Sequence, residues 1–399
     1  MISYERALQI VLAQSLDYGE VDVPLQDSLG RVLAQTVLAD RDFPPFDRAV
    51  RDGIAINFDA YRSKGGPLPV EGTAQAGDPQ MHLRDKACCL EVMTGAILPK
   101  NTDTVVMYEH TMKAMGSFTI EGPLRKGQHI HYRGSDIKAG EAVLHQGTKI
   151  DAAAIGVLAS VGKAEVPVKK VPKIAVVSTG NELVEVGETP LPHQIRKSNA
   201  HTLKALLERD KIEAGLFHLQ DDRPAMERAV EQWIATYDVL LLSGGVSMGK
   251  YDFLPEVFER LGVEKLFHKV AQRPGKPFWF GRHPKNGCLI FSYPGNPVST
   301  YLCHRLYLIP WLDKGMGRET PQYDVIMGTT YTNTTELTLF MGAKIAPESG
   351  KLVATLVPSS GSGDLTGLAS IDGFVRLAPL GTVEADGLIP FVPIKNILT

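Results

Sequence analysis

Three loops rich in glycine, serine and asparagine each follow a short apolar run, at residues 178–182, 243–249 and 294–299. Glycine lets a phosphate group approach the backbone, hydroxyl groups add hydrogen-bond donors, and the N-terminus of a following helix favours an anion. One such loop is typical of any strand-to-helix turn, but three in one domain indicate a nucleotide or another phosphorylated ligand. The residues expected to bind it are Ser178, Thr179, Gly180, Ser243, Gly244, Gly245, Ser247, Pro294, Gly295 and Asn296.

Four carboxylates accompany these loops, namely Glu182, Asp221, Asp222 and Asp252. Hard divalent cations take oxygen ligands and bridge to phosphate, so carboxylates beside a phosphate site could hold a metal ion. Helix capping is the alternative, because Asp222 directly precedes an Arg-Pro pair that suits the first turn of a helix. For Asp221 and Asp222, the residue types favour neither metal binding nor helix capping.

Three cations, Lys269, Arg273 and Lys276, surround a Pro-Gly turn just after the last of the helical stretches that alternate with strands. A guanidinium offers a planar fork and an ammonium a point charge, and together they could hold phosphate, pyrophosphate or an oxyanion such as molybdate. A solvated basic turn is the other interpretation, and the run by itself indicates no more than that.

The elements that must position these loops alternate between apolar runs and amphipathic stretches from residue 173 to 315. Short unbroken runs of Val, Ile and Leu, separated by stretches of helical periodicity, predict a parallel α/β sheet covered on both faces. Two further apolar runs, KPFWFGRH and GCLIFSYPG, should extend the sheet, and a helix should run from 296 to about 314.

The rest of the chain is richer in short alternating runs, so we expect a multidomain fold that combines α/β and β regions. Residues 41–145 predict a β-rich domain, and residues 1–40 with 146–172 an extended linking domain of a helix and strands. Within the latter, 166–173 is predicted to be a basic, proline-bracketed linker. The α/β domain takes 173–315, and 316–399 should form a small C-terminal β-domain.

Composition restricts the function classes further. The 399 residues contain 44% hydrophobic and 22% charged residues with a formal net charge of −3, which fits a folded soluble protein and argues against a nucleic-acid binder. The four cysteines show neither zinc-ligand spacing nor a disulfide framework, so a reducing cytoplasm is expected. No apolar stretch predicts a signal peptide or a membrane span.

Other polar turns have no evident chemistry on physical grounds. Asp52 and Thr94 each precede a glycine in what looks like an ordinary hairpin connection, and residues 133–136 and 359–364 read the same way. The chain shows no Ser/His/Asp order, no HExxH motif, no Walker loop and no GxGxxG after a strand.

Taken in order, seven segments resemble the molybdopterin molybdenumtransferase family of the MoeA and gephyrin E-domain type: PPFDRAVRDGIAI, MTGAILP, RGSDIKAGE, STGNEL, LSGGVSMGKYD, RPGKP and PGNPVS. The resemblance covers essentially the whole chain. It implies a MogA-like α/β domain and a C-terminal domain resembling a small β-barrel. It also implies a homodimer whose active site lies between subunits, and a reaction in which molybdate is inserted into adenylylated molybdopterin and AMP is released with Mg²⁺.

The family's functional positions transfer one by one to residues of this chain. Those implied to be catalytic are Asp52, Thr94, Glu182, Asp221, Asp252, Lys269 and Arg273. Glu182, Asp221 and Asp252 are the implied Mg²⁺ ligands or hold the attacking water, while Lys276 and Ser362 are expected to contact the substrate. Asp52 and Thr94 should reach the site from the partner subunit. A MogA-type molybdopterin adenylyltransferase is the implied upstream partner.

The chain departs from the family pattern at several positions: Ile54 replaces an aromatic residue, Arg51 precedes the Asp-Gly pair, and Ser135 replaces a glutamate. Lys344 stands in the segment where the family often carries an arginine. A non-catalytic molybdopterin-binding scaffold and a paralogue that handles tungstate or acts as an adenylyltransferase are the alternatives. The set of acids around the phosphate loops favours the enzyme, because a protein that only binds has no need of them.

Overall fold

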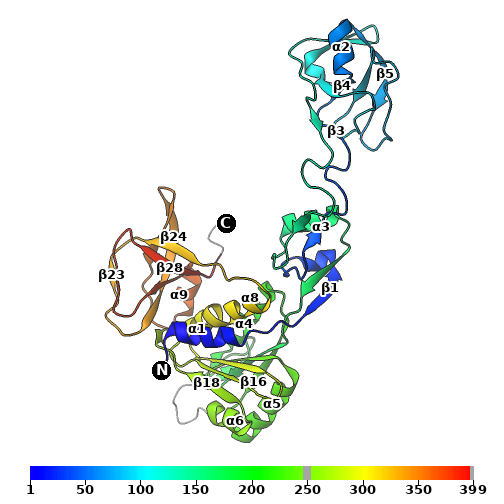
Figure 1. The fold of residues 1–399 in the computed structure, drawn as a ribbon. Helices are drawn as coiled ribbons and strands as arrows, with labels where there is room; N and C mark the ends of the chain where they lie inside the picture. The colour runs from blue at the N-terminus through cyan, green and yellow to red at the C-terminus, as the bar shows by residue number, and fades with distance from the viewer. Residues whose placement is uncertain (246–252, 396–399) are drawn as a thin grey trace.

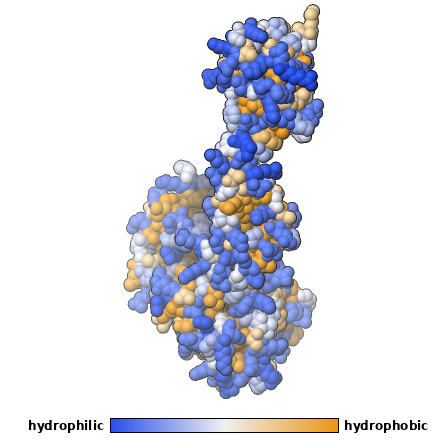
Figure 2. Space-filling model, turned by 45° about the vertical axis from the view of Figure 1, so that its right-hand side comes forward, coloured by the Kyte–Doolittle hydropathy of each residue, from blue (hydrophilic) through white to orange (hydrophobic). Residues whose placement is uncertain are grey.

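The structure is a computed structural model that describes residues 1–245 and 253–395, so Ser247, Gly249 and Asp252 lie outside the described residues. Four regions follow one another in space (Figure 1): a β-rich region at one end, a linking region beneath it, and an α/β region beside a C-terminal barrel at the other end. Figure 2 shows the narrow waist that separates the β-rich end from the rest. The predicted α/β plus β fold class is confirmed, whereas the exact domain boundaries remain our proposal.

The α/β region is built on a six-stranded sheet in the order β16-β13-β17-β21-β20-β18. Its first four strands are parallel, β20 pairs antiparallel with β21, and β18 at the edge pairs antiparallel with β20. The strands are β13 (Ile174–Thr179), β16 (Ala214–Leu219), β17 (Val239–Ser243), β18 (Glu264–His268), β20 (Trp279–Arg282) and β21 (Leu289–Tyr293). The two extra apolar runs therefore extend the sheet, as predicted.

Helices cover both faces of this sheet, which explains why its strands are apolar without alternation. Val176, Leu241 and Phe291 face one core, whereas Val177 and Leu242 face the other. The helices are α4 (Ser198–Arg209), α5 (Arg223–Thr236), α6 (Leu254–Arg260), α7 (Pro297–Cys303), the π-helix η3 (His304–Leu308) and α8 (Ile309–Gly315). The first core also includes Tyr4, Ala7 and Val11 of α1 (Tyr4–Ala13), which lies between the α/β region and the barrel (Figure 1).

The C-terminal region contains a closed five-stranded barrel in the order β24-β25-β22-β28-β26, with β26 pairing back to β24. The barrel strands are β22 (Tyr323–Met327), β24 (Thr338–Glu348), β25 (Lys351–Leu356), β26 (Gly373–Leu377) and β28 (Leu388–Pro393), and α9 (Leu365–Ser370) lies between β25 and β26. Strand β19 (Gln272–Arg273), from the α/β part of the sequence, pairs with β24. This pairing joins the basic turn to the barrel.

The linking region is formed by two segments that are distant in sequence. Strand β1 (Glu20–Pro24) pairs with β12 (Glu165–Lys169), and β2 (Val37–Leu38) pairs with β11 (Ala142–Leu144). Helix α3 (Ala152–Ser160) is capped by Asp151, whose Oδ1 accepts from the Ala154 N–H at 2.8 Å. The predicted linker at 166–173 was wrong in part, because Val166 and Val168 are fully buried and alternate as a strand requires.

The β-rich region holds a six-stranded sheet in the order β7-β4-β6-β5-β9-β8. The strands are β4 (Gly53–Ile56), β5 (Leu68–Ala74), β6 (Cys89–Val92), β7 (Thr104–Met107), β8 (Thr111–Ala114) and β9 (Ser117–Ile120), with α2 (Phe58–Lys64) beside them. A separate pair, β3 (Arg48–Ala49) with β10 (Ile130–His131), connects this sheet to the linking region. In the described parts of the chain, none of the helices has the length and apolar character needed to cross a membrane.

We predict that Phe280→Ala lowers the free energy of unfolding of the α/β region by about 3 to 5 kcal/mol, because the ring is fully buried against Phe267 and Phe291. Urea unfolding followed by tryptophan fluorescence measures it, since all three tryptophans lie in this region. Leu216→Ala, at a side chain 38% exposed on β16, is the control. An equal loss in both variants would contradict the assignment of this core.

Candidate functional site

The carboxyl ends of three neighbouring strands lie level with one another. Ser178 of β13 pairs with Ser243 of β17, which pairs with Tyr293 of β21. Strand β16 lies on the side of β13 that faces away from β17. The chain thus goes from β13 to β16 in one direction along the sheet and from β17 to β21 in the opposite direction, so the strand order reverses at the gap between β13 and β17. In open α/β sheets such a gap is where ligands bind. The described parts of the three glycine-containing loops predicted from the sequence therefore begin at one edge of the sheet.

Glycines allow these loops to approach closely. Gly244 has φ +97°, and a Cβ there would come within 2.7 Å of the Thr179 Oγ1. A Cβ on Gly295 would contact the Gly244 Cα at 3.6 Å, and the Gly244 N–H donates to the Tyr293 carbonyl at 3.1 Å. A side chain at position 244 would separate the loops, so glycine is required there by both its φ angle and its neighbours.

Asn199, on the first turn of α4, connects two of the loops. Its Nδ2 donates to the Ser243 Oγ and to the Gly295 carbonyl, each at 2.7 Å. Ser178, Thr179 and Ser243 are themselves buried, and the Thr179 hydroxyl donates to the Ser243 carbonyl at 3.3 Å. The Thr179 and Ser243 hydroxyls therefore hold the strand ends together. Sequence reasoning missed Asn199 because its role appears only when the loops are adjacent.

A cavity of about 980 Å³ lies between this edge and the C-terminal barrel region. Its size is at the upper end of what small-molecule sites span. From the barrel side it is lined by residues 339–342 of β24 and by residues 359–363 of the loop between β25 and α9. The predicted residues that line it are Gly244, Arg273, Lys276, Pro294, Gly295, Asn296 and Ser362.

The basic turn is fixed by Gln272, which is fully buried. Its Nε2 donates to the Pro274 carbonyl at 3.0 Å, and its Oε1 accepts from the Tyr307 hydroxyl. Arg273 and Lys276 are exposed on this rigid turn and border the cavity. No sequence pattern indicated Gln272, because a buried glutamine next to a charged motif cannot be distinguished from an exposed one. Lys269 is not among the described residues that line the cavity.

The loop between β25 and α9 is attached to the α/β region by two hydrogen bonds. Asn296 Nδ2 donates to the Ser362 Oγ at 2.7 Å, and the Val298 N–H donates to the Ser362 carbonyl at 3.0 Å. Asp364 caps α9 by accepting from the Gly367 N–H at 2.8 Å. Asn296 and Ser362 thus lie together across the cavity although 66 positions separate them.

Two of the predicted metal ligands, Glu182 and Asp221, lie on the loops after β13 and β16. The Glu182 carboxylate folds back over Gly180, where an added Cβ would be 2.3 Å from its Oε2. The Asp221 N–H donates to the Asn181 Oδ1 at 3.0 Å. Among residues 1–245 and 253–395, no three His, Cys, Asp or Glu side chains gather closely enough to hold a metal ion. The metal assignment, which includes Asp252, stays a prediction.

Asp52 and Thr94 lie together in the β-rich region. This region is at the opposite end of the molecule from the α/β region and the barrel, whose residues line the cavity (Figure 1). The Thr94 N–H and Oγ1 both donate to the Asp52 Oδ1, at 2.6 and 2.8 Å. These two hydrogen bonds, the backbone one first, lower the pKa of Asp52 below its usual value. The pair therefore forms a small preorganised unit, and its participation in the site stays a prediction.

The departures from the family pattern have different structural settings. Ile54 is fully buried in β4, whereas Ser135 is exposed and its Oγ donates to the Asp136 Oδ1 at 3.3 Å. Lys344 is exposed on β24, opposite Thr355 of β25, and is not among the described residues that line the cavity. Arg376 of β26 lies over the Tyr4 ring, 5.5 Å from its centroid.

Replacing Asn199 by alanine is expected to destabilise the strand ends. Loss of two hydrogen bonds should lower the free energy of unfolding by about 1 to 3 kcal/mol and raise hydrogen exchange at the amides of Gly244 and Gly295, read by mass spectrometry. His201→Ala, at an exposed residue of the same helix, is the matched control. Unchanged exchange in the Asn199 variant would show that this amide does not hold the loops.

Thr94→Val should raise the pKa of Asp52 only part of the way to its usual value, since the backbone N–H still donates. Because the folded-state pKa is lowered, these bonds contribute stability at pH above the usual pKa, and it is lost as pH falls through the lowered value. A carboxyl NMR titration measures the shift, with Thr94→Ser as the control that keeps the hydroxyl. Identical pKa values in Thr94→Val and wild type would refute the role of the side chain.

Comparisons with known proteins agree with this architecture. Two family models match the chain, "MoeA N-terminal region (domain I and II)" over residues 2–162 and "Probable molybdopterin binding domain" over residues 175–314. A crystal structure of the molybdopterin biosynthesis moeA protein from Pyrococcus horikoshii OT3 superimposes with a TM-score of 0.82 at 26% identity, covering 98% of this chain and 100% of that one.

Curated relatives are similar over nearly their full length. A protein from Synechocystis named molybdopterin molybdenumtransferase is 38% identical over 382 residues, which is 94% of this chain and 95% of the relative. A protein of the same name from Staphylococcus epidermidis is 32% identical over 393 residues, with 96% and 92% covered. With this identity over nearly all of both chains, and with the fold shared as well, the protein belongs to the molybdopterin molybdenumtransferase family.

Proposed function

We propose that this protein inserts molybdate into adenylylated molybdopterin and releases AMP, yielding molybdenum cofactor. The observation that carries the proposal is the cavity of about 980 Å³ that joins the glycine-lined strand ends, the cations Arg273 and Lys276, and the loop at 359–363. Backbone approach for a phosphate and fixed cations for an oxyanion are what this substrate pair requires. The curated relatives carry the name of this activity.

The chain's own residues divide the work between holding the substrate and stabilising charge. Gly244 and Gly295 leave room for the phosphates beside the strand ends, where a side chain would block them. When a water oxygen bonds to phosphorus and the phosphoanhydride bond breaks, negative charge develops on the oxygens of the leaving phosphate. Arg273 and Lys276 stabilise that charge from a turn that Gln272 holds rigid, and Lys269 adds a third cation to this segment.

The Mg²⁺ site that we propose combines Glu182, Asp221 and Asp252, whose oxygens suit a hard cation. The described residues do not form a complete donor set, since they contain no group of three possible ligands, and Asp252 lies outside them. Mg²⁺ would supply charge neutralisation at the phosphates when bound.

A homodimer completes the proposal. Asp52 and Thr94 are distant from the cavity of their own chain (Figure 1), so we propose that the β-rich region of a partner subunit brings them to it. We also propose a cytoplasmic location, which fits the four free cysteines, and a MogA-type adenylyltransferase as the source of the adenylylated substrate. A sequence pI of about 6.4 supports neither nucleic acid nor an anionic membrane surface as a partner.

The test is AMP release from adenylylated molybdopterin, with and without molybdate and Mg²⁺. Wild type should release AMP only when both are present, and Arg273→Ala should release it about a hundredfold more slowly, because a preorganised charge at the developing anion is lost. Asp252→Ala should be inactive, and added Mg²⁺ should not restore AMP release. Lys265→Ala, at an exposed lysine of β18, should behave like wild type.

Two results would contradict the proposal. Tight substrate binding without AMP release by the wild type would identify a molybdopterin-binding scaffold. Full activity of Arg273→Ala would show that the cavity takes no part in the reaction. Tungstate assayed in parallel shows which oxyanion is inserted. Light scattering should show that the wild type and the variants are all dimers, so that a loss of rate reports on the site.

A further inference from the structure

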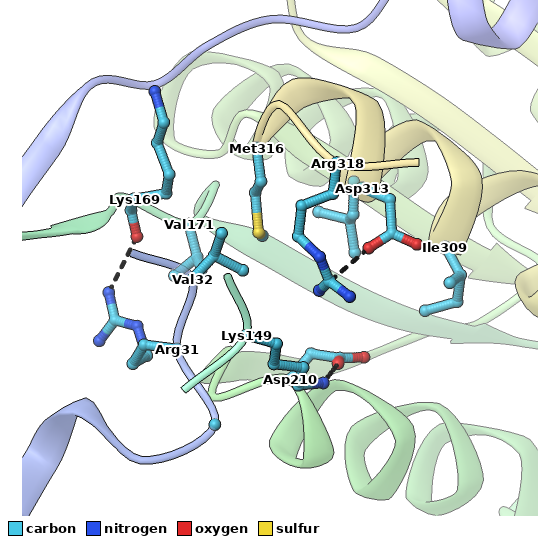
Figure 3. A pocket seen from close by; sticks show the side chains of 12 residues that line it. Arg31, Val32, Lys149, Lys169, Val171, Asp210, Ile309, Asp313, Met316 and Arg318 are labelled. Atoms are coloured by element: carbon cyan, nitrogen blue, oxygen red, sulfur yellow. Dashed lines mark hydrogen bonds and ion pairs between the residues drawn. The ribbon is translucent and has the colours of Figure 1, made fainter. Parts of the chain in front are cut away.

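A second polar cleft, which we call the junction cleft, lies where the linking region meets the α/β region. It consists of two hollows of about 20 and 300 Å³ that share Lys149, Asp210, Ile309, Asp313 and Arg318. The smaller hollow, shown in Figure 3, is bordered by Arg31 and Lys169 of the linking region. The larger one is bordered by α4, the π-helix and α8. Neither shares a described lining residue with the large cavity.

The larger hollow has more cations than carboxylates. Lys149 pairs with Asp210 at 2.8 Å and Arg318 with Asp313 at 3.4 Å, as Figure 3 shows. These two pairs use both carboxylates of the hollow. Two further guanidinium groups line it, those of Arg209 and Arg305, so the described lining carries an excess of two positive charges.

Buried donors add to this excess charge. His304 is fully buried, and neither of its ring nitrogens has a hydrogen-bond partner among the described residues. The buried Nε of Arg305 likewise has none among them. Leaving buried polar groups unpaired costs free energy, so a hollow lined by such groups favours a ligand that accepts hydrogen bonds.

The backbone that presents these two residues is unusual. His304–Leu308 forms a π-helix between α7 and α8, and Pro310, near the start of α8, has no N–H to continue the α-helical bonding pattern. π-helical turns are rare and occur preferentially at functional sites. The turn places His304 and Arg305 side by side on the wall of the same hollow.

We propose that the junction cleft binds a phosphate-class oxyanion, held by Arg209, Arg305 and the His304 ring. A tetrahedral oxyanion offers several acceptor oxygens and a charge that matches the excess of the lining. Because the cleft is bordered by Lys149 of the linking segment as well as by α4 and α8, binding connects the two regions. The site is independent of the proposed reaction, since it shares no described residue with the cavity.

The test uses full-length protein carrying Arg273→Ala and Lys276→Ala, which removes the cations of the large cavity. Inorganic phosphate, titrated at constant ionic strength, should raise the thermal unfolding midpoint, as any ligand of the native state does. Adding Arg209→Ala should weaken the apparent phosphate affinity about tenfold, the effect of one charge-assisted hydrogen bond. Arg209 is exposed at the end of α4, so the variant should fold, and exposed Arg228 of α5, replaced by alanine, is the matched control.

AMP titrated in the same way distinguishes a phosphate group on a small molecule from the free ion. A site that is open to a phosphate monoester binds both AMP and inorganic phosphate, whereas a more closed site binds inorganic phosphate alone. NMR of selectively labelled histidine provides a second readout. The chemical shifts of the His304 ring nitrogens should change when phosphate is added to the cavity variant, and they should not change once Arg209→Ala is also present. The proposal is overturned if phosphate fails to stabilise the cavity variant, or if Arg209→Ala and Arg228→Ala bind phosphate equally well.

Discussion

The close contact between the loops that end β13, β17 and β21 is the constraint on which the rest of the site depends. A Cβ on Gly244 would lie only 2.7 Å from the Thr179 Oγ1, which a side chain would not allow, and a Cβ on Gly295 would be in van der Waals contact with the Gly244 Cα. Asn199 then fixes the arrangement by bonding to two of the loops. Since the strands are in register, this contact decides where the backbone of Gly244 and Gly295 borders the cavity.

The cavity exists only because distant segments converge on that contact. The basic turn is part of the α/β sequence, yet its strand β19 pairs with β24 of the barrel, and Ser362 from the barrel side bonds to Asn296. The barrel therefore forms one wall of the site, and α1 strengthens the junction through Tyr4, whose ring packs against Phe340 and Tyr307. Changes in either region should reach the site through these contacts.

The sequence predicted the parts of the site whose physics is local. Continuous apolar runs such as 239–242 are typical of a doubly covered sheet, so the strands, their order of alternation with helices and the loops at their ends were predictable. Asn199 and Gln272 were not, because each acts on segments that become neighbours only after folding. Asp52 and Thr94 came from the family resemblance alone, and nothing in their hairpin setting distinguishes them. The strand β12 was mistaken for a linker because its prolines and lysines outweighed the alternation of Val166 and Val168.

A crystal structure of the protein with adenylylated molybdopterin, obtained by soaking without molybdate, is the most direct test of the central claim that the substrate binds at the strand ends facing the barrel. The account predicts the phosphates beside Gly244 and Gly295, with an oxygen within hydrogen-bond distance of Arg273 or Lys276. Density for the nucleotide elsewhere, with the cavity between β17 and the loop at 359–363 containing only solvent, would contradict it.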